Sequence, residues 1–260
     1  MRGGTHVVAS AIVALLVFTA ASPLPSWAAD RYWKSASVGG SEDAPYDIWD
    51  TANWDGAVGS GNHLHFSVSE KTYIKSTSSQ QVGNDLDVDS GDFVFIGPLK
   101  FLAFKNTTAN ATVNIVKKGD WEIYNYEFWG GSGDGVHLTF TNESGNLTKT
   151  GSSGQTIFLA EGANSEVEFY HRAGTMTAAK YGIILGRKTA KRAYLEISGG
   201  TVKNTAGNIS ICEITTDEGT GEVKVTGGEL LAEAGSVIVG VKGRGTLNVD
   251  GGVSGHLPLA

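Results

Sequence analysis

Three groups of side chains in this sequence have types and spacings that could support chemistry. The first is the run Asp-Leu-Asp-Val-Asp-Ser-Gly-Asp at residues 85–92. Alternate carboxylates can direct several oxygens at one hard cation, as in calcium-binding loops. An EF-hand-type loop, however, requires its glycine one position before Gly91 and a glutamate where Ile96 stands. A strand with Leu86 and Val88 facing inward and the aspartates in water explains the run equally well.

The second group is a histidine pair. His63 and His65 are two residues apart in an alternating stretch, which places both side chains on one face of a strand. The pair could bind a metal, but no third ligand stands at a suitable spacing, and two histidines alone do not form a closed or catalytic site. We therefore expect a solvated face. The sequence predicts no metal site, no cofactor and no catalytic residue, and it leaves the ligand-binding residues unknown.

The third group is aromatic, and its members are Trp121, Tyr124, Tyr126, Phe128 and Trp129. Flat rings pack against the apolar faces of sugar rings, so these residues could form a sugar-stacking platform. Packing in a core or cap is the commoner use of such residues. The same two interpretations, with packing favoured more strongly, apply to three tryptophans nearer the N-terminus: Trp33, Trp49 and Trp54.

The fold that must position these groups is predicted from a repeat between residues 167 and 252. Each copy opens with an alternating triplet, passes a glycine-containing turn and, in the first three copies, ends in a short apolar run such as Ile-Ile-Leu-Gly at 183–186. The triplets are 28, 28 and 24 residues apart and begin at Val167, Leu195, Val223 and Leu247. Period-two alternation predicts strands with one buried face, and glycine permits the positive φ of a tight turn. One copy cannot bury its own apolar face, so the copies are expected to stack.

The predicted fold is an all-β parallel β-solenoid, or β-helix, of two-strand units whose opening residues stack in one column. No copy contains ten residues with helical spacing, which argues against leucine-rich and helical repeats, and propeller blades repeat at ~40 residues or more. The chain has 36 glycines, 18% charged and 40% hydrophobic residues, which suits a turn-rich β protein and not a disordered one. A net charge of −7 gives no attraction for nucleic acid or anionic lipid.

The only cysteine, Cys212, excludes an intrachain disulfide framework. It occupies the position that Gly186 and Gly240 fill in neighbouring copies, so we expect a small buried residue, and the sequence offers no base partner for a catalytic thiol. Asn106 and Asn142 begin glycosylation sequons, which matter only if the source organism glycosylates asparagine.

Four segments are expected along the chain. Residues 1–28 have a weakly basic start, an apolar stretch at 7–21 and a Ser-Trp-Ala cleavage site, which predicts a secretory signal peptide; an uncleaved anchor is the rival interpretation. Residues 29–70 are expected to form an aromatic-rich N-terminal cap, and residues 71–146 irregular β rungs. Residues 147–260 should form regular glycine-punctuated repeats, apparently truncated in the fourth copy.

Several short motifs follow one another along the chain. Tyr-Trp at 32–33, Asn-Trp at 53–54 and His-Leu-His-Phe-Ser-Val at 63–68 are followed by Leu-Thr-Lys-Thr-Gly at 147–151 and Leu-Asn-Val-Asp-Gly-Gly at 247–252. This order resembles that of secreted bacterial proteins with autotransporter-associated β-strand repeats, over most of the mature chain. The resemblance implies a β-helical, passenger-like body outside the cell and no particular ligand.

Two function classes follow. The first is an exported, non-catalytic β-solenoid, secreted or at the cell surface, that acts as an adhesive or structural element. The second is a carbohydrate-binding or polysaccharide-degrading protein. β-Helical enzymes that degrade polysaccharides need clustered carboxylates, or a metal beside Lys or Arg. The outward positions of the repeat vary and show no stacked acid pair: Glu168, Glu196, Lys224 and Asn248. We therefore expect the first class.

The expected partner is an extracellular polysaccharide or another cell-surface component, with no nucleic acid and no membrane span in the mature chain. The fourth copy breaks off after Gly252. An open rung exposes strand edges, so we expect either a shortened member of a longer family or end-to-end self-association.

Overall fold

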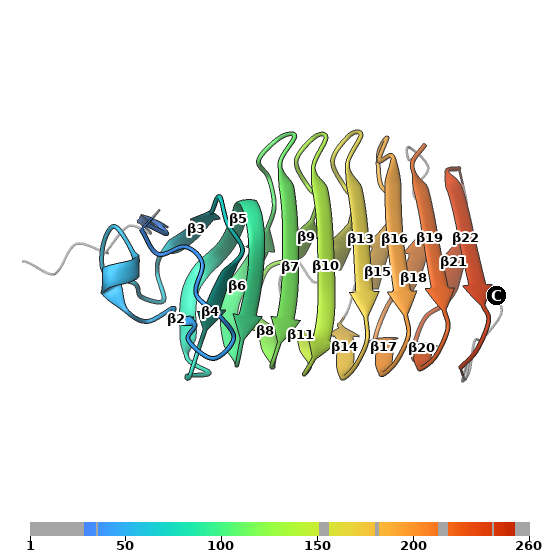
Figure 1. Cartoon of the computed structure of the whole chain (residues 1–260). Helices are drawn as coiled ribbons and strands as arrows, with labels where there is room; N and C mark the ends of the chain where they lie inside the picture. Colours follow the sequence, from blue (N-terminus) through green and yellow to red (C-terminus); the bar gives the residue numbers. More distant parts are fainter. Residues whose placement is uncertain are drawn as a thin grey trace, which may run out of the picture.

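The computed structural model describes residues 29–34, 36–150, 156–179, 182–212, 218–240 and 242–252. In this part the chain winds into a parallel β-solenoid of about 7 turns. The turns stack side by side into a rod, with the C-terminal strands at one end (Figure 1). The predicted all-β parallel β-solenoid is therefore confirmed. The predicted signal peptide, residues 1–28, lies outside the described residues.

Three faces run along the rod. Face 1 holds the long strands at the front of Figure 1, and each pairs in parallel with the equivalent strand of the next turn. Its members are β2 (Tyr46–Asp47), β4 (Thr72–Lys75), the end of β5 (Gln81–Ile96), β7 (Thr112–Lys118), β10 (His137–Ser144), β13 (Glu166–His171), β16 (Arg192–Ile197), β19 (Thr220–Val225) and β22 (Arg244–Val249).

Face 2 follows face 1 along the chain. It consists of the start of β5, the start of β6 (Leu99–Lys105), β8 (Trp121–Ile123), β11 (Leu147–Lys149), β14 (Thr175–Ala178), β17 (Thr201–Asn204) and β20 (Glu229–Ala232).

Face 3 completes each turn. It consists of β1 (Asp30–Tyr32), β3 (His63–Ser67), the middle of β5, the end of β6, β9 (Phe128–Gly130), β12 (Thr156–Leu159), β15 (Gly182–Leu185), β18 (Asn208–Ile211) and β21 (Val237–Val239).

Each complete turn contains three strands, so the predicted two-strand unit is wrong. The strands that the prediction missed are those of face 2. In β14, for example, Met176 and Ala178 face the core while Thr175 and Thr177 face outward. This alternation is present in the sequence, but it lies directly after the turn glycine and is only four residues long.

The predicted stacking column is correct in three positions and wrong in one. Leu195 pairs with Val223, and Val223 pairs with Leu247. The residue paired with Leu195 in β13 is Phe169, whereas Val167 pairs with Ala193. Val167 and Phe169 both face the core, so alternation alone cannot decide which of them stacks on the next turn.

The core changes character along the rod. In the first half, the rings of Phe66, Phe95, Trp121 and Phe140 follow one another with centroid distances of 5.5, 5.4 and 5.7 Å. Such edge-to-face pairs stabilise a fold by ~0.5–1.5 kcal/mol each beyond burial alone. After Phe169, which stacks on Phe140 at 4.8 Å, the buried side chains are chiefly aliphatic, as they are in β16 to β20.

A column of glycines forms the corner between faces 1 and 2. Gly174, Gly200 and Gly228 have φ values of 77°, 70° and 82°, which confirms the predicted glycine turns. A Cβ on Gly200 would lie 2.3 Å from the carbonyl oxygen of Gly174 in the preceding turn. Glycine is required here for two reasons, because the backbone conformation and the close approach each exclude a side chain.

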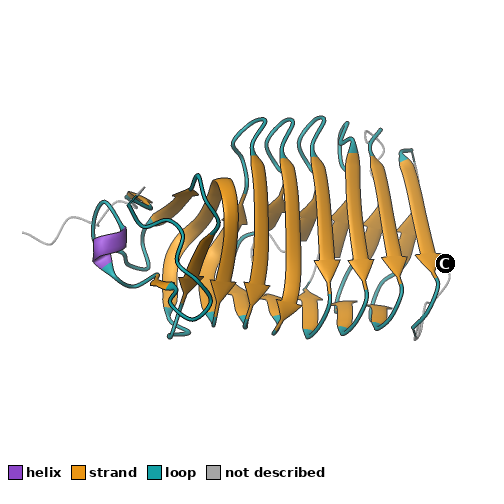
Figure 2. Cartoon of the chain, in the orientation of Figure 1, coloured by secondary structure: helices purple, strands orange, loops and turns teal. Residues whose placement is uncertain are grey.

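Aromatic residues cover the N-terminal end of the rod, where the short 3-10 helix η1 (Thr51–Asn53) lies (Figure 2). Trp33 and Trp54 are buried edge to face at 5.0 Å, and Trp54 packs on Phe66 at 5.0 Å. Trp49 is half-buried and donates its Nε1–H to Ser76 Oγ at 3.2 Å. The packing role predicted for these tryptophans is confirmed.

Candidate functional site

Histidines and aspartates gather on the outer surface of face 3, near the N-terminal end. Parallel pairing of β3 with β5 places His63 beside Asp85 and His65 beside Asp87. These side chains face outward because the alternating apolar residues of both strands fill the core: Leu64, Phe66, Leu86 and Val88. The predicted inward direction of Leu86 and Val88 is confirmed. The shared face of the two histidines is confirmed as well.

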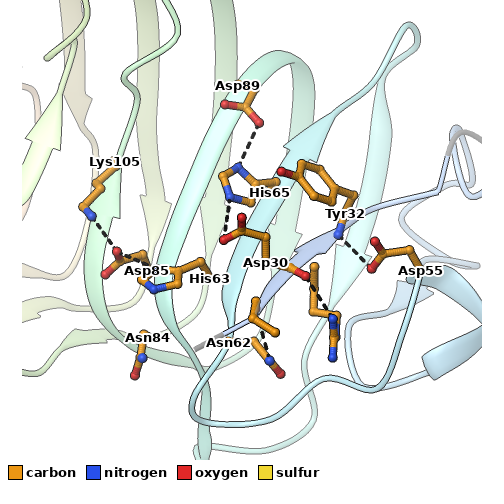
Figure 3. Close-up of polar contacts among 12 residues, drawn as sticks. Asp30, Tyr32, Asp55, Asn62, His63, His65, Asn84, Asp85, Asp89 and Lys105 are labelled. Carbon is orange, nitrogen blue, oxygen red and sulfur yellow. Dashed lines mark hydrogen bonds and ion pairs between the residues drawn. The ribbon is translucent and has the colours of Figure 1, made fainter. Parts of the chain in front are cut away.

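Hydrogen bonds and ion pairs join these side chains in two sets of three (Figure 3). Asp85 Oδ2 accepts from Lys105 Nζ at 2.5 Å and lies 2.8 Å from His63 Nδ1. His65 Nδ1 lies 3.3 Å from Asp89 Oδ2, and its Nε2 lies 3.7 Å from Asp30 Oδ1. The carboxylates of Asp85 and Asp89 therefore already have cationic or hydrogen-bonding neighbours.

Two of the four aspartates in the run 85–92 are not in water, so the prediction of a solvated aspartate face is wrong for them. Asp85 and Asp87 are only 5% and 8% exposed. The next turn of the rod covers them, because β6 brings Lys105 into register with Asp87. The calcium-loop alternative also finds no support, since no group of three or more His, Cys, Asp or Glu side chains within the described ranges is arranged to hold a metal ion.

Asp87 is electrostatically unusual. Its Oδ1 is buried and has no hydrogen-bond partner among the described residues. Burial raises the pKa of Asp87, while the positive charge of Lys105 and the neighbouring His65 act in the opposite direction. A carboxyl with a raised pKa in a polar cluster can hold a proton that an ordinary surface aspartate would have lost.

A pocket of about 350 Å³ opens beside this cluster, and it is lined by His63, Asn84, Asp85, Leu102, Lys105, Tyr126 and Trp129. Trp129 stands next to Lys105 because β9 pairs with the end of β6, and the Lys105 Nζ lies 5.6 Å from the centroid of the Trp129 ring. Tyr126 is held by the hydrogen bond of its backbone N–H to Leu102 O at 2.8 Å. The pocket thus combines two aromatic side chains with a paired lysine and carboxylate.

The predicted aromatic group is divided between the core and the surface. Trp121 in β8 and Phe128 in β9 are buried, which confirms packing for these two. Tyr124 and Tyr126 lie in the corner between the strands and are 47% and 43% exposed, and Trp129 faces outward and is half-buried. The stretch from Trp121 to Trp129 is therefore two short strands with a corner between them. Only Tyr126 and Trp129 reach the pocket.

The structure also places the cysteine and the two asparagines of the glycosylation sequons. Cys212 is buried with a φ of 56°, and it takes the same corner position as Gly186 and Gly240, whose φ values are 71° and 64°. This confirms the expected small buried residue. Asn106 and Asn142 are both 0% exposed, so neither sequon can carry a glycan in the folded chain.

The pocket contains two polar side chains that no pattern in the sequence indicated, Lys105 and Asn84. Neither stands in a motif, and each reaches the site only through the register of neighbouring turns. No helix in the described part of the chain is long and apolar enough to span a bilayer. Comparisons with protein-family models, with curated proteins and with solved structures found no match.

Proposed function

We propose that the protein is an exported, non-catalytic β-solenoid that acts as an adhesive element and contacts extracellular polysaccharide through the pocket formed by Lys105, Tyr126 and Trp129. The observation that carries this proposal is the pairing of outward aromatic rings with a lysine–carboxylate pair in one pocket. Aromatic faces match the apolar faces of sugars, and the charged pair offers hydrogen bonds to hydroxyl or carboxylate groups. A volume of about 350 Å³ lies within the range of small-ligand sites.

The scaffold supports a contact function. Every wall of the pocket belongs to a strand or to a corner that is hydrogen-bonded to the next turn, so the site is formed before a ligand arrives. Pre-organisation lowers the entropy cost of binding. The resemblance to secreted passenger-like proteins and the predicted signal peptide support the proposed location outside the cell.

Retention on insoluble polysaccharides and affinity electrophoresis in soluble ones test the proposal. We expect at least one polysaccharide to be bound, and Trp129→Ala to weaken that binding about tenfold through loss of ring stacking. Tyr124→Ala is the control, because Tyr124 is an exposed aromatic residue of the same corner as Tyr126 but does not line the pocket. Binding that is unchanged in Trp129→Ala, or that is absent for every polysaccharide tested, would refute the pocket as a polysaccharide site.

Polysaccharide cleavage is the second candidate, and one observation favours it. Burial raises the pKa of both Asp87 and Glu127, and the charge of Lys105 acts on both. A carboxyl with a raised pKa is suited to general acid catalysis. Release of sugar fragments by the wild-type protein, lost in Asp87→Asn or Glu127→Gln, would establish this candidate and overturn the non-catalytic one. Retention without release supports the first proposal.

A further inference from the structure

A polar column lies inside the rod, away from the pocket. The parallel register of β7, β10 and β13 places Lys117, Asn142 and His171 directly above one another. All three side chains are 0% exposed. The same column continues with Phe95 on one side and Ile197 on the other, so three polar residues interrupt an otherwise apolar row.

Lys117 is buried without a carboxylate ion-pair partner in the described part of the chain. Its Nζ donates to Asn142 Oδ1 at 2.7 Å and to Ser144 O at 2.9 Å. Burial lowers the pKa of Lys117 to about 7, against the opposing charge of Asp120. A large share of the molecules therefore holds a neutral amine in contact with a carboxamide at neutral pH, and a desolvated neutral lysine is a nucleophile.

The third member of the column stands at the nitrogen of that carboxamide. Asn142 Nδ2 lies 2.9 Å from His171 Nδ1, and His171 Nε2 lies 3.2 Å from Gly174 O. Because Nε2–H donates to the carbonyl, Nδ1 carries the lone pair and accepts from Nδ2. A proton acceptor thus stands beside the one group of Asn142 that could leave.

We propose that Lys117 and Asn142 form an intramolecular isopeptide cross-link between adjacent turns of the rod, with release of ammonia. The Nζ–Cγ bond forms and the Cγ–Nδ2 bond breaks. The attacking nitrogen gives up one proton, and the leaving nitrogen takes one up to become NH₃. No oxidant, reductant or other reactant is needed, since the step exchanges one amide for another.

His171 is the group that moves the proton. In the tetrahedral intermediate both nitrogens are bonded to the same carbon, so Nδ1, which already touches Nδ2, can take the proton from the Lys117 nitrogen and pass it to the leaving group. The register of β7 and β10 holds the reacting groups in contact, and effective molarities for such oriented pairs reach about 10⁵–10⁸ M. Exclusion of water from the core removes the competing hydrolysis.

Intact-mass spectrometry of the purified wild-type chain tests the cross-link directly. We expect a mass about 17 Da below the value for the same sequence, which is the mass of one ammonia. A proteolytic digest should contain a branched peptide that joins Lys117 to Asn142. This peptide separates the cross-link from loss of ammonia at another asparagine. A wild-type chain of full mass with no branched peptide would overturn the proposal, whether or not any variant folds.

Variants locate the chemistry. Lys117→Met and Asn142→Leu should each abolish the mass deficit, and His171→Phe should slow its appearance in freshly expressed protein. Lys149→Met is the matched control, because Lys149 is also buried but its Nζ donates to the backbone oxygen of Thr150. A deficit that persists in Lys117→Met, or that disappears in Lys149→Met, would contradict the assignment.

Discussion

At the scale of single residues, burial determines which side chains respond to pH. His171 lies inside the rod between Asn142 and the carbonyl of Gly174, and burial lowers its pKa from 6.5 to about 4. Between these two pH values the unfolded chain binds a proton that the native chain does not. Stability contributed by neutral His171 is therefore complete above pH 6.5 and is lost as the pH falls towards 4.

This shift predicts the acid sensitivity of the fold. It corresponds to ~3 kcal/mol of unfolding free energy lost across that interval. Urea unfolding at pH 6.5 and pH 4 should show a smaller loss in His171→Gln than in the wild type, even if the variant is less stable at both pH values. His137→Gln is the control, because the His137 side chain is 52% exposed. Equal losses in His171→Gln and wild type would contradict the prediction.

The residue scale is also where sequence analysis predicted least. The outward position of His63 and His65 followed from alternation, but the burial of Asp85 did not, since Lys105 covers it from another turn. Likewise, nothing local in the sequence brings Lys117 to Asn142, which are 25 residues apart in the chain. Contacts between turns depend on register, and register depends on corner lengths that vary from turn to turn.

At the scale of elements, the sequence was more informative. In the repeat, alternating triplets identified the strands of face 1, short apolar runs identified those of face 3, and the glycines identified the corners, because these signals are local. The strands of face 2 were missed because four residues after a turn glycine give too short a pattern. Val167 was wrongly predicted to stack on Leu195, because Val167 and Phe169 both face the core in β13 and alternation does not distinguish them.

The glycine corner gives a prediction at this scale. Gly200→Ala should lower the free energy of unfolding by at least ~1–3 kcal/mol. The new Cβ would have to be accommodated at a φ of 70° and would lie 2.3 Å from Gly174 O. Gly61→Ala should be nearly neutral, because a Cβ on Gly61 meets no atom within 4 Å. Chemical denaturation of both variants measures the difference. Similar stabilities would show that the corner tolerates a side chain.

At the scale of the whole molecule, stability should depend on position along the rod. In a stack, each turn is stabilised only by its neighbours. The strand β13 pairs with β10 and β16, whereas β22 pairs only with β19 among the described strands. The side chains of Val239 and Val249 near that end are 41% and 47% exposed.

Amide hydrogen exchange of the dilute protein should therefore be slowest in β13 and fastest in β22. The predicted end-to-end self-association would add protection at β22 as the concentration rises, with β13 unchanged. Equal protection of both strands at low concentration would contradict the nearest-neighbour description. Protection of β22 that does not change with concentration would count against self-association.

The parallel pairing of successive turns also has a mechanical consequence. The hydrogen bonds that join one turn to the next run along the rod (Figure 1), so tension between its two ends would load them in their own direction and open one interface at a time. A released turn such as the 26 residues from Glu166 to Arg192 would add about 80 Å of extended chain. A rod of this kind would lengthen stepwise under load, and a covalent link between β7 and β10 would hold one of those steps closed.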